Sequence, residues 1–259
     1  MIPRPSPLPG GDLPDGPMAT KDLPVPASAL AIVAHPDDAE FHCGATLAKW
    51  AAQGCVLNHL VLTDGSKGTW DPDADIDALA EQRTHEQMEA ARRLGSQGKV
   101  VMLGHVDGEL LATLHLRDQV AYWIRSIAPE VILSHDPWRR YRLHPDHRNA
   151  GFLALDGLVA ARDPHFFRHH DVPVHRTDTV LLFEADAPDH VEDVSGHVDT
   201  KVTALLAHRS QYVTTHGIPA EDDGSAEELF RQRVVTQAAE IGARTGVASG
   251  EVFKAITEL

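Results

Sequence analysis

After Ala29 the chain alternates short apolar runs with segments of helical periodicity, and this alternation restricts the fold more than any other feature. The first run, residues 30–34, is continuously apolar, as expected for a strand covered on both faces. Further strands are predicted at 56–62, 100–103, 131–133 and 179–183, and helices at 44–53, 84–94, 116–127 and 149–161. This order predicts an α/β, Rossmann-like fold: a mostly parallel sheet with helices on both faces. Right-handed crossovers would then bring the active site to the carboxyl ends of the strands.

The segment before these elements has a different composition. Residues 1–26 contain eight of the 17 prolines, so they cannot build a hydrophobic core. We expect an extended or disordered arm over residues 1–26 and a single domain over residues 27–259. Met18 lies inside the arm, and the sequence leaves the start of translation open between Met1 and Met18.

The overall composition excludes several classes of protein. The chain has 38 acidic and 23 basic residues, which argues against nonspecific binding to nucleic acid or anionic lipid. It contains no apolar run of the roughly 20 residues that a membrane helix needs, and its start lacks the pattern of a secretory signal. We therefore expect a cytoplasmic protein. Two cysteines are too few for a disulfide framework, whereas 17 histidines direct attention to metal chemistry.

Two short motifs could supply a metal site. The first, His-Pro-Asp-Asp at residues 35–38, directly follows the first strand, and the second, His-Pro-Asp-His at residues 144–147, follows the fourth. Each taken alone could be ordinary turn or loop chemistry. Because both lie at the predicted carboxyl edge, they could together provide the three nitrogen or oxygen ligands of a catalytic zinc ion. The remaining acid and base groups would then lie beside the bound water.

These motifs resemble the PIG-L/LmbE-like family of zinc-dependent N-deacetylases, which act mainly on N-acetylglucosamine conjugates. The matching segments follow the family's order and are residues 34–38 with Gly44, 62–65, 83–95, 144–147, and Lys201 through His208 to Gln211. The resemblance implies bound zinc, with iron(II) as the alternative in the cell. It implies that His35, Asp38 and His147 are the metal ligands.

The resemblance also implies roles for neighbouring residues. Asp37 resembles the general base that takes a proton from the attacking water. His144 resembles the group that stabilises the oxyanion and protonates the leaving amine, with Asp146 orienting it. Arg83 matches an arginine that holds the substrate, although a solvent-facing helix charge is the alternative. Arg142 stands where some family members have a tyrosine, so it could contact substrate or be a surface arginine.

A structural role is expected for the other polar residues of note. Lys201 and His208 would brace a late helix. His42 lies near the first motif and could support it, but a histidine at a helix start is favoured. His169 and His170 would lie in a solvated loop, since no pair of carboxylates frames them at ligand spacing.

The leading functional hypothesis is a zinc-dependent hydrolase that removes an N-acetyl or short N-acyl group from a glucosamine-containing small molecule. An amidase of thiol-sugar conjugates of the mycothiol type would use the same metal centre. Less favoured alternatives are a non-haem iron oxygenase, which generally has an all-β barrel, and an inactive binding module. The sequence lacks the glycine fingerprint of dinucleotide-binding folds. We expect an amino-sugar conjugate as the partner and leave a homo-oligomer open.

Overall fold

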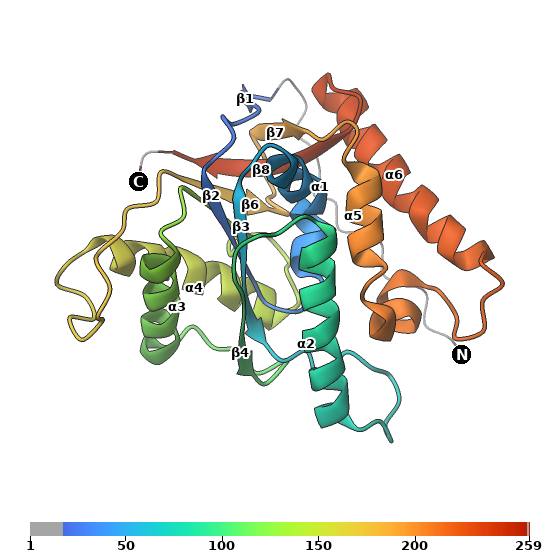
Figure 1. Ribbon diagram of the computed structural model, residues 1–259, viewed down its shortest axis with the longest axis horizontal. Coiled ribbons are helices and arrows are strands. Elements are labelled where there is room, and N and C mark those ends of the chain that lie inside the picture. The colour runs from blue at the N-terminus through green and yellow to red at the C-terminus, as the bar shows by residue number, and fades with distance from the viewer. Residues whose placement is uncertain (1–17, 258) are drawn as a thin grey trace.

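The computed structural model describes residues 18–257 and residue 259. Within these residues eight strands form one sheet in the order β1-β7-β8-β6-β5-β2-β3-β4 (Figure 1). Their bounds are β1 Thr20–Lys21, β2 Ser28–Val33, β3 Val56–Thr63, β4 Val100–His105, β5 Val131–His135, β6 Thr179–Phe183, β7 His190–Asp193 and β8 Gly250–Ile256. Strand β8 is antiparallel to both of its neighbours, and the other pairs are parallel. The predicted mostly parallel sheet is confirmed.

Helices cover both faces of the sheet, as predicted (Figure 1). Their bounds are α1 Asp38–Ala52, α2 Ile76–Arg93, α3 Leu114–Ile127, α4 Pro145–Arg162, α5 Val198–Leu205 and α6 Ser225–Thr245, with a 3₁₀ turn at Arg209–Gln211 and a π turn at Tyr212–His216. Helices α3 and α4 lie on one face, and α1, α2, α5 and α6 lie on the other.

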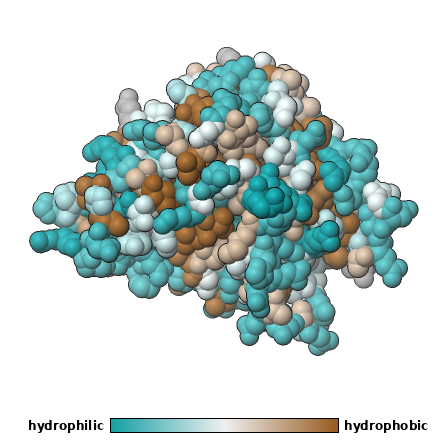
Figure 2. All heavy atoms as spheres, viewed as in Figure 1, coloured by the Kyte–Doolittle hydropathy of each residue, from teal (hydrophilic) through white to brown (hydrophobic). Residues whose placement is uncertain are grey.

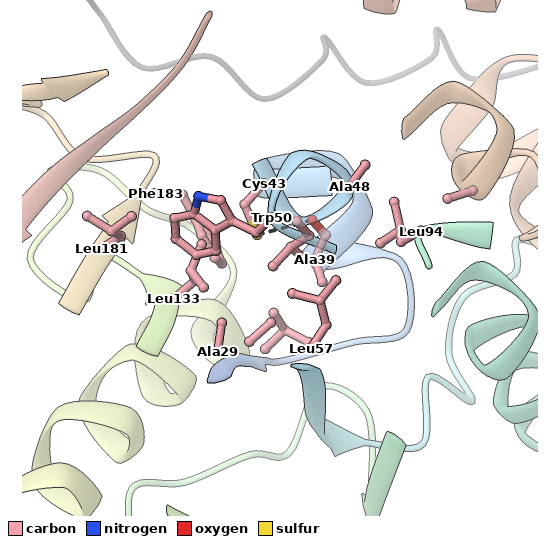
Figure 3. Close-up of a cluster of buried hydrophobic side chains, with 14 of the residues drawn as sticks. Ala29, Ala39, Cys43, Ala48, Trp50, Leu57, Leu94, Leu133, Leu181 and Phe183 are labelled. Atoms are coloured by element: carbon pink, nitrogen blue, oxygen red, sulfur yellow. Dashed lines mark hydrogen bonds between the residues drawn. The ribbon is translucent and has the colours of Figure 1, made fainter. Parts of the chain in front are cut away.

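Strand β2 shows why the sequence needs two helical layers. Ala29, Ala31 and Val33 belong to the hydrophobic core beneath α1, whereas Leu30 and Ile32 point into the core beneath α3 and α4. All five side chains are fully buried. Figure 3 shows the first of these cores, in which Trp50 of α1 lies among side chains from the sheet. A strand that is apolar on both sides is thus stable only between two layers.

Three helices begin four or more residues earlier than the sequence analysis predicted. Helix α1 begins at residue 38 instead of 44, α2 at 76 instead of 84, and α4 at 145 instead of 149. For α1 and α4 the difference arises because residues of the polar motifs, which lack apolar periodicity, form the first turns. Residues of both His-Pro-Asp motifs therefore occupy helix N-termini, where backbone N–H groups favour negative charge.

Helix α1 is bent close to its predicted start. Cys43 has non-helical backbone angles, φ −141° and ψ 16°. The N–H groups of Ala45 and Thr46, next to the bend, donate to the carboxylate of Glu251 at 3.2 and 2.7 Å. A side chain from β8 thus caps the second part of α1.

The ends of the sheet were not predicted. Strands β7 and β8, from the C-terminal part of the chain, complete the sheet, and β1 pairs with β7. Helix α6 precedes β8. Leu23 and Val25, from the proline-rich arm, pack against the first core. Residues 1–17 of the arm lie outside the described residues.

None of the described helices combines the length and apolar character needed to cross a bilayer. The face drawn in Figure 2 mixes hydrophilic and hydrophobic residues, with hydrophilic side chains predominating.

Candidate metal centre

The two His-Pro-Asp motifs meet at the carboxyl edge of the sheet, as the crossover argument predicted. His35 follows β2, and His147 lies in the first turn of α4. Although 112 positions separate them in sequence, His35 Nδ1 lies 3.1 Å from His147 Nε2. The parallel topology therefore converts two distant segments into one site.

The three predicted metal ligands present their donor atoms to one another. Asp38 Oδ2 lies 3.4 Å from His35 Nδ1, and Asp38 Oδ1 lies 3.4 Å from His147 Nε2. In a tetrahedral zinc site with bonds of about 2.0 Å, ligand atoms lie about 3.3 Å apart. Two imidazoles and a carboxylate at these separations fit a zinc ion. Their assignment as ligands stays a prediction.

Two carboxylates engage the other nitrogen of His35. Asp107 Oδ1 and Asp146 Oδ2 lie 3.1 and 3.2 Å from His35 Nε2. Burial alone would lower the pKa of His35. Asp107, Asp146 and Asp38 raise it by a larger amount, so the net pKa is well above its usual value. Because Asp107 and Asp146 bind the N–H at Nε2, Nδ1 is the nitrogen that faces the other predicted ligands.

Asp146 is itself fixed by the loop after β4. It accepts hydrogen bonds from the N–H groups of Gly108 and Leu110 at 2.6 and 3.2 Å. Asp146 thus contacts His35. Its predicted role, to orient His144, stays a prediction. Asp107 was missed by the sequence analysis, because nothing in its local sequence distinguishes it from an ordinary loop acid.

Asp37, the predicted general base, lies beside this centre but faces different partners. Its Oδ2 is 3.3 Å from Nη2 of Arg83. Burial raises the pKa of Asp37 to about 6, although the Arg83 charge opposes this rise. A carboxylate whose pKa lies near neutral pH is suited to accept and release a proton.

His144 occupies the solvent side of the centre. Its ring centroid lies 4.7 Å from that of His35 and 4.8 Å from that of His147. Partial burial, together with the His35 charge, lowers the pKa of His144. The exposed imidazole is thus placed where an incoming molecule would meet it first.

The protein itself engages both predicted substrate arginines. Arg83 is 3% exposed and contacts Asp37, so it is not a solvent-facing helix charge. Arg142 Nη1 lies 2.5 Å from Glu184 Oε1, to which Arg139 also donates at 2.7 Å. The substrate contacts of both arginines stay predictions.

A second polar cluster lies behind the predicted ligands. His135 Nε2 is 3.3 Å from Asp38 Oδ2, and its Nδ1 is 3.6 Å from Glu184 Oε2. His42 Nε2 lies 3.5 Å from the same oxygen, and its ring stacks on Phe183. Burial raises the pKa of Glu184, but the neighbouring His42, His135 and Arg142 outweigh it and hold the pKa well below its usual value.

The contacts of His42 support the less favoured alternative, in which it lies near the first motif and supports the site. Its ring is buried among the groups that surround Asp38. His135 and Glu184 could have been anticipated, because they end β5 and follow β6 at the same sheet edge.

The histidine pair near residue 170 has a structural role that the sequence analysis did not foresee. His169 is exposed as expected, but the His170 ring is buried and lies 2.5 Å from Asp118 Oδ1. Arg125 donates to His170 Nδ1 at 3.0 Å. Since arginine can only donate, the His170 proton lies on Nε2 and points at Asp118, which leaves no nitrogen for a metal.

The predicted bracing roles of Lys201 and His208 agree with their contacts. Lys201 Nζ lies 2.7 Å from Glu251, and His208 Nε2 lies 3.5 Å from Glu40 Oε2. All four side chains are buried.

Comparison with known proteins agrees with this geometry. The family model described as PIG-L, GlcNAc-PI de-N-acetylase, matches residues 30–158. The chain is 34% identical over 186 residues to a diacetylchitobiose deacetylase of Thermococcus kodakarensis, a match that covers 71% of this chain and 69% of the relative. The chain belongs to the PIG-L family.

Further relatives are similar over different lengths. A 1D-myo-inositol 2-acetamido-2-deoxy-alpha-D-glucopyranoside deacetylase of Streptomyces avermitilis is 30% identical over 171 residues, covering 56% of this chain and 57% of the relative. The solved N,N'-diacetylchitobiose deacetylase of Pyrococcus horikoshii superposes with a TM-score of 0.79 at 29% identity, covering 90% of this chain and 84% of that one. These relatives are named deacetylases, that is, amide hydrolases acting on N-acetyl groups.

Proposed function

We propose that the chain is a zinc-dependent amide hydrolase that removes an N-acetyl or short N-acyl group from a glucosamine-containing small molecule. One observation carries the proposal: the donor atoms of His35, Asp38 and His147 converge at 3.1–3.4 Å beside the Asp37 carboxylate. The names of the PIG-L relatives support an N-acetylated amino sugar as the substrate.

The converging donors would hold the zinc ion. When bound, zinc acts as a Lewis acid, which lowers the pKa of water and polarises the amide carbonyl. The same donor set also suits iron(II), but amide hydrolysis needs no change of redox state. Asp107 and Asp146 keep the His35 ring in the orientation that presents Nδ1.

The remaining residues move protons. Asp37 accepts a proton from the attacking water as the oxygen adds to the amide carbon. In its protonated form, which the lowered pKa makes a stronger proton donor, His144 stabilises the negative charge that develops on the carbonyl oxygen. It then donates its proton to the nitrogen as the C–N bond breaks, which releases a carboxylic acid and a free amine.

The substrate, the location, the oligomeric state and the domain bounds are also part of the proposal. An amidase of larger thiol-sugar conjugates would use identical chemistry with a different substrate. The cytoplasmic location, the homo-oligomer and the single domain over residues 27–259 remain expectations of the sequence.

Amine release from diacetylchitobiose, measured with and without a chelator, tests the proposal. We expect turnover that is lost with the metal and restored by zinc. Turnover that a chelator leaves unchanged would contradict a metal-dependent hydrolase. Oxygen consumption by an iron-loaded protein would instead favour the oxygenase, and metal binding without turnover of any N-acyl amino sugar would favour a binding module.

The variant Asp37→Asn tests the base. We expect kcat to fall by about 10²- to 10⁴-fold, because the amide cannot accept the proton, while zinc content stays at the wild-type level. The matched control is Asp199→Asn, which changes an exposed carboxylate on α5. Wild-type kcat in Asp37→Asn would assign the base to another residue.

A further inference from the structure

We infer that Arg83 and Gln87, here called the α2 clamp, are positioning residues that hold the peptide unit before Asp37 and thereby aim its carboxylate. This inference rests on the proposed function, in which Asp37 is the general base. It gives Arg83 a role that differs from the substrate contact implied by the family resemblance.

Asp37 has a backbone conformation that needs outside support. Its φ is 97° and its ψ is −23°, in the left-handed region that residues other than glycine rarely adopt. The residue precedes α1, yet its side chain makes no capping hydrogen bond to the helix. Such a conformation persists only when surrounding contacts hold it.

The α2 clamp binds both polar groups of the peptide unit that joins Pro36 to Asp37. Arg83 Nη2 donates to the carbonyl oxygen of Pro36 at 2.6 Å, and the Asp37 N–H donates to Gln87 Oε1 at 3.0 Å. Arg83 and Gln87 are four positions apart, so they project from the same face of α2. One helix face therefore restrains this peptide plane from two directions.

Arg83 also reaches the carboxylate itself. The same Nη2 lies 3.3 Å from Asp37 Oδ2, and Nη1 donates to the Gly65 carbonyl at 2.9 Å. A Cβ at Gly65 would lie 2.9 Å from the Arg83 guanidinium, and one at Gly68 would overlap it. The loop after β3 thus needs glycine at both positions to let the guanidinium pass.

The orientation of Gln87 is fixed by a buried anion behind it. Gln87 Nε2 donates to Glu40 Oε1 at 2.9 Å, and the Glu40 carboxylate also faces His208. Gln87, Glu40 and His208 are all fully buried. Because a carboxylate only accepts, the Gln87 NH₂ must face Glu40, which leaves its oxygen directed at the Asp37 N–H.

The variant Gln87→Met tests the clamp, because it keeps an unbranched side chain and removes the acceptor. With diacetylchitobiose as the probe, we expect kcat to fall about 10- to 100-fold while KM and zinc stoichiometry stay unchanged. The matched control Gln82→Met, a glutamine bound to Glu86 on the outer side of α2, should keep the wild-type kcat. Equal kcat values for Gln87→Met and the wild type would overturn the inference.

A rescue variant separates positioning from general damage. In Gln87→Glu combined with Glu40→Gln, the carboxylate still accepts from Asp37 and the new amide still donates to residue 87. We expect this pair to recover most of the lost kcat, whereas Gln87→Glu alone, with two facing carboxylates, should not. A double variant no better than Gln87→Met would count against the clamp.

A crystal structure of Gln87→Met tests the inference without any substrate. We expect Asp37 to leave its positive φ and its carboxylate to turn from Arg83; an unchanged Asp37 would refute the clamp. If Gln87→Met does not fold, Gln87→Asn, whose shorter amide cannot reach Asp37, takes its place. A wild-type chain that releases no amine would defeat the proposed function while leaving this structural test intact.

Discussion

At the scale of the single residue, His216 shows how strongly surroundings alter a side chain. It ends the π turn and its ring packs between those of Phe41 and Phe230, with centroids at 5.5 and 4.5 Å. Neither ring nitrogen has a hydrogen-bond partner among residues 18–257 and 259. Burial lowers the pKa of His216 to about 3, and nearby positive groups add to this effect.

This histidine should make the fold sensitive to acid. Below the ordinary histidine pKa of about 6.5, the unfolded chain takes up a proton that the folded chain excludes until about pH 3. The free energy of unfolding should therefore decrease as pH falls through this window. We expect the variant His216→Phe to gain about 2 kcal/mol over the wild type between pH 8 and pH 5, measured by urea unfolding.

The control for this prediction is His165→Phe, which changes an exposed histidine. Its stability relative to the wild type should vary little over the same pH range, since water solvates that ring in both states. A His216→Phe curve parallel to the wild type would show that another group sets the acid sensitivity.

At the scale of the element, the bend in α1 depends on one ion pair. Glu251 accepts from two backbone N–H groups of the helix and lies 2.7 Å from Lys201 Nζ. Both charged side chains are buried, so each relies on the other for compensation. The part of α1 before the bend carries Asp38.

We expect the variant Glu251→Ala to lose about 3 to 5 kcal/mol of unfolding free energy. The substitution leaves the buried Lys201 ammonium without a partner and removes the acceptor for two N–H groups of α1. Adding Lys201→Met should recover part of this loss. The control Glu227→Ala removes a surface pair with Arg231 and should cost only about 0.3 to 0.5 kcal/mol. Similar losses in the two glutamate variants, compared in urea unfolding curves, would show that the pair does not support α1.

At the scale of the whole molecule, the proposed zinc ion would join the two halves of the sheet edge. It would bind the folded chain and not the unfolded one, so it should stabilise the fold by about 2.7 kcal/mol at 100 times its dissociation constant. For a chain of this size we expect a chelator to lower Tm by about 5 to 10 °C. A Tm that is the same for metal-free and zinc-loaded protein would contradict a site shared between α1 and α4.

The order of elements along most of the chain could be predicted, because apolar runs and helical periodicity report burial directly. The convergence of residues 35–38 with 144–147 followed from parallel topology alone. Helix starts were misplaced wherever polar motif residues formed the first turn. Strand β8 escaped prediction because its pairing is antiparallel and does not follow from the alternation of strands and helices.

The partners of the motif residues were much harder to predict. Asp107 has no distinguishing local pattern, and His135 and Glu184 stand out only by their places at the ends of β5 and β6. The clamp on Asp37 depends on a helix face that the sequence analysis treated only through Arg83. Such contacts are set by how elements pack, which composition and spacing do not encode.

The cap supplied by β8 has a consequence for biosynthesis. Thr46 precedes Glu251 by 205 residues, so at ordinary translation rates about 10 to 40 s separate the emergence of the helix from that of its cap. During that interval the nascent chain already exposes the histidine and the two acids of the first motif without the strand that completes their support. Metal acquisition is therefore expected to follow release from the ribosome, and a chain that stalls before residue 251 would be left with an immature centre.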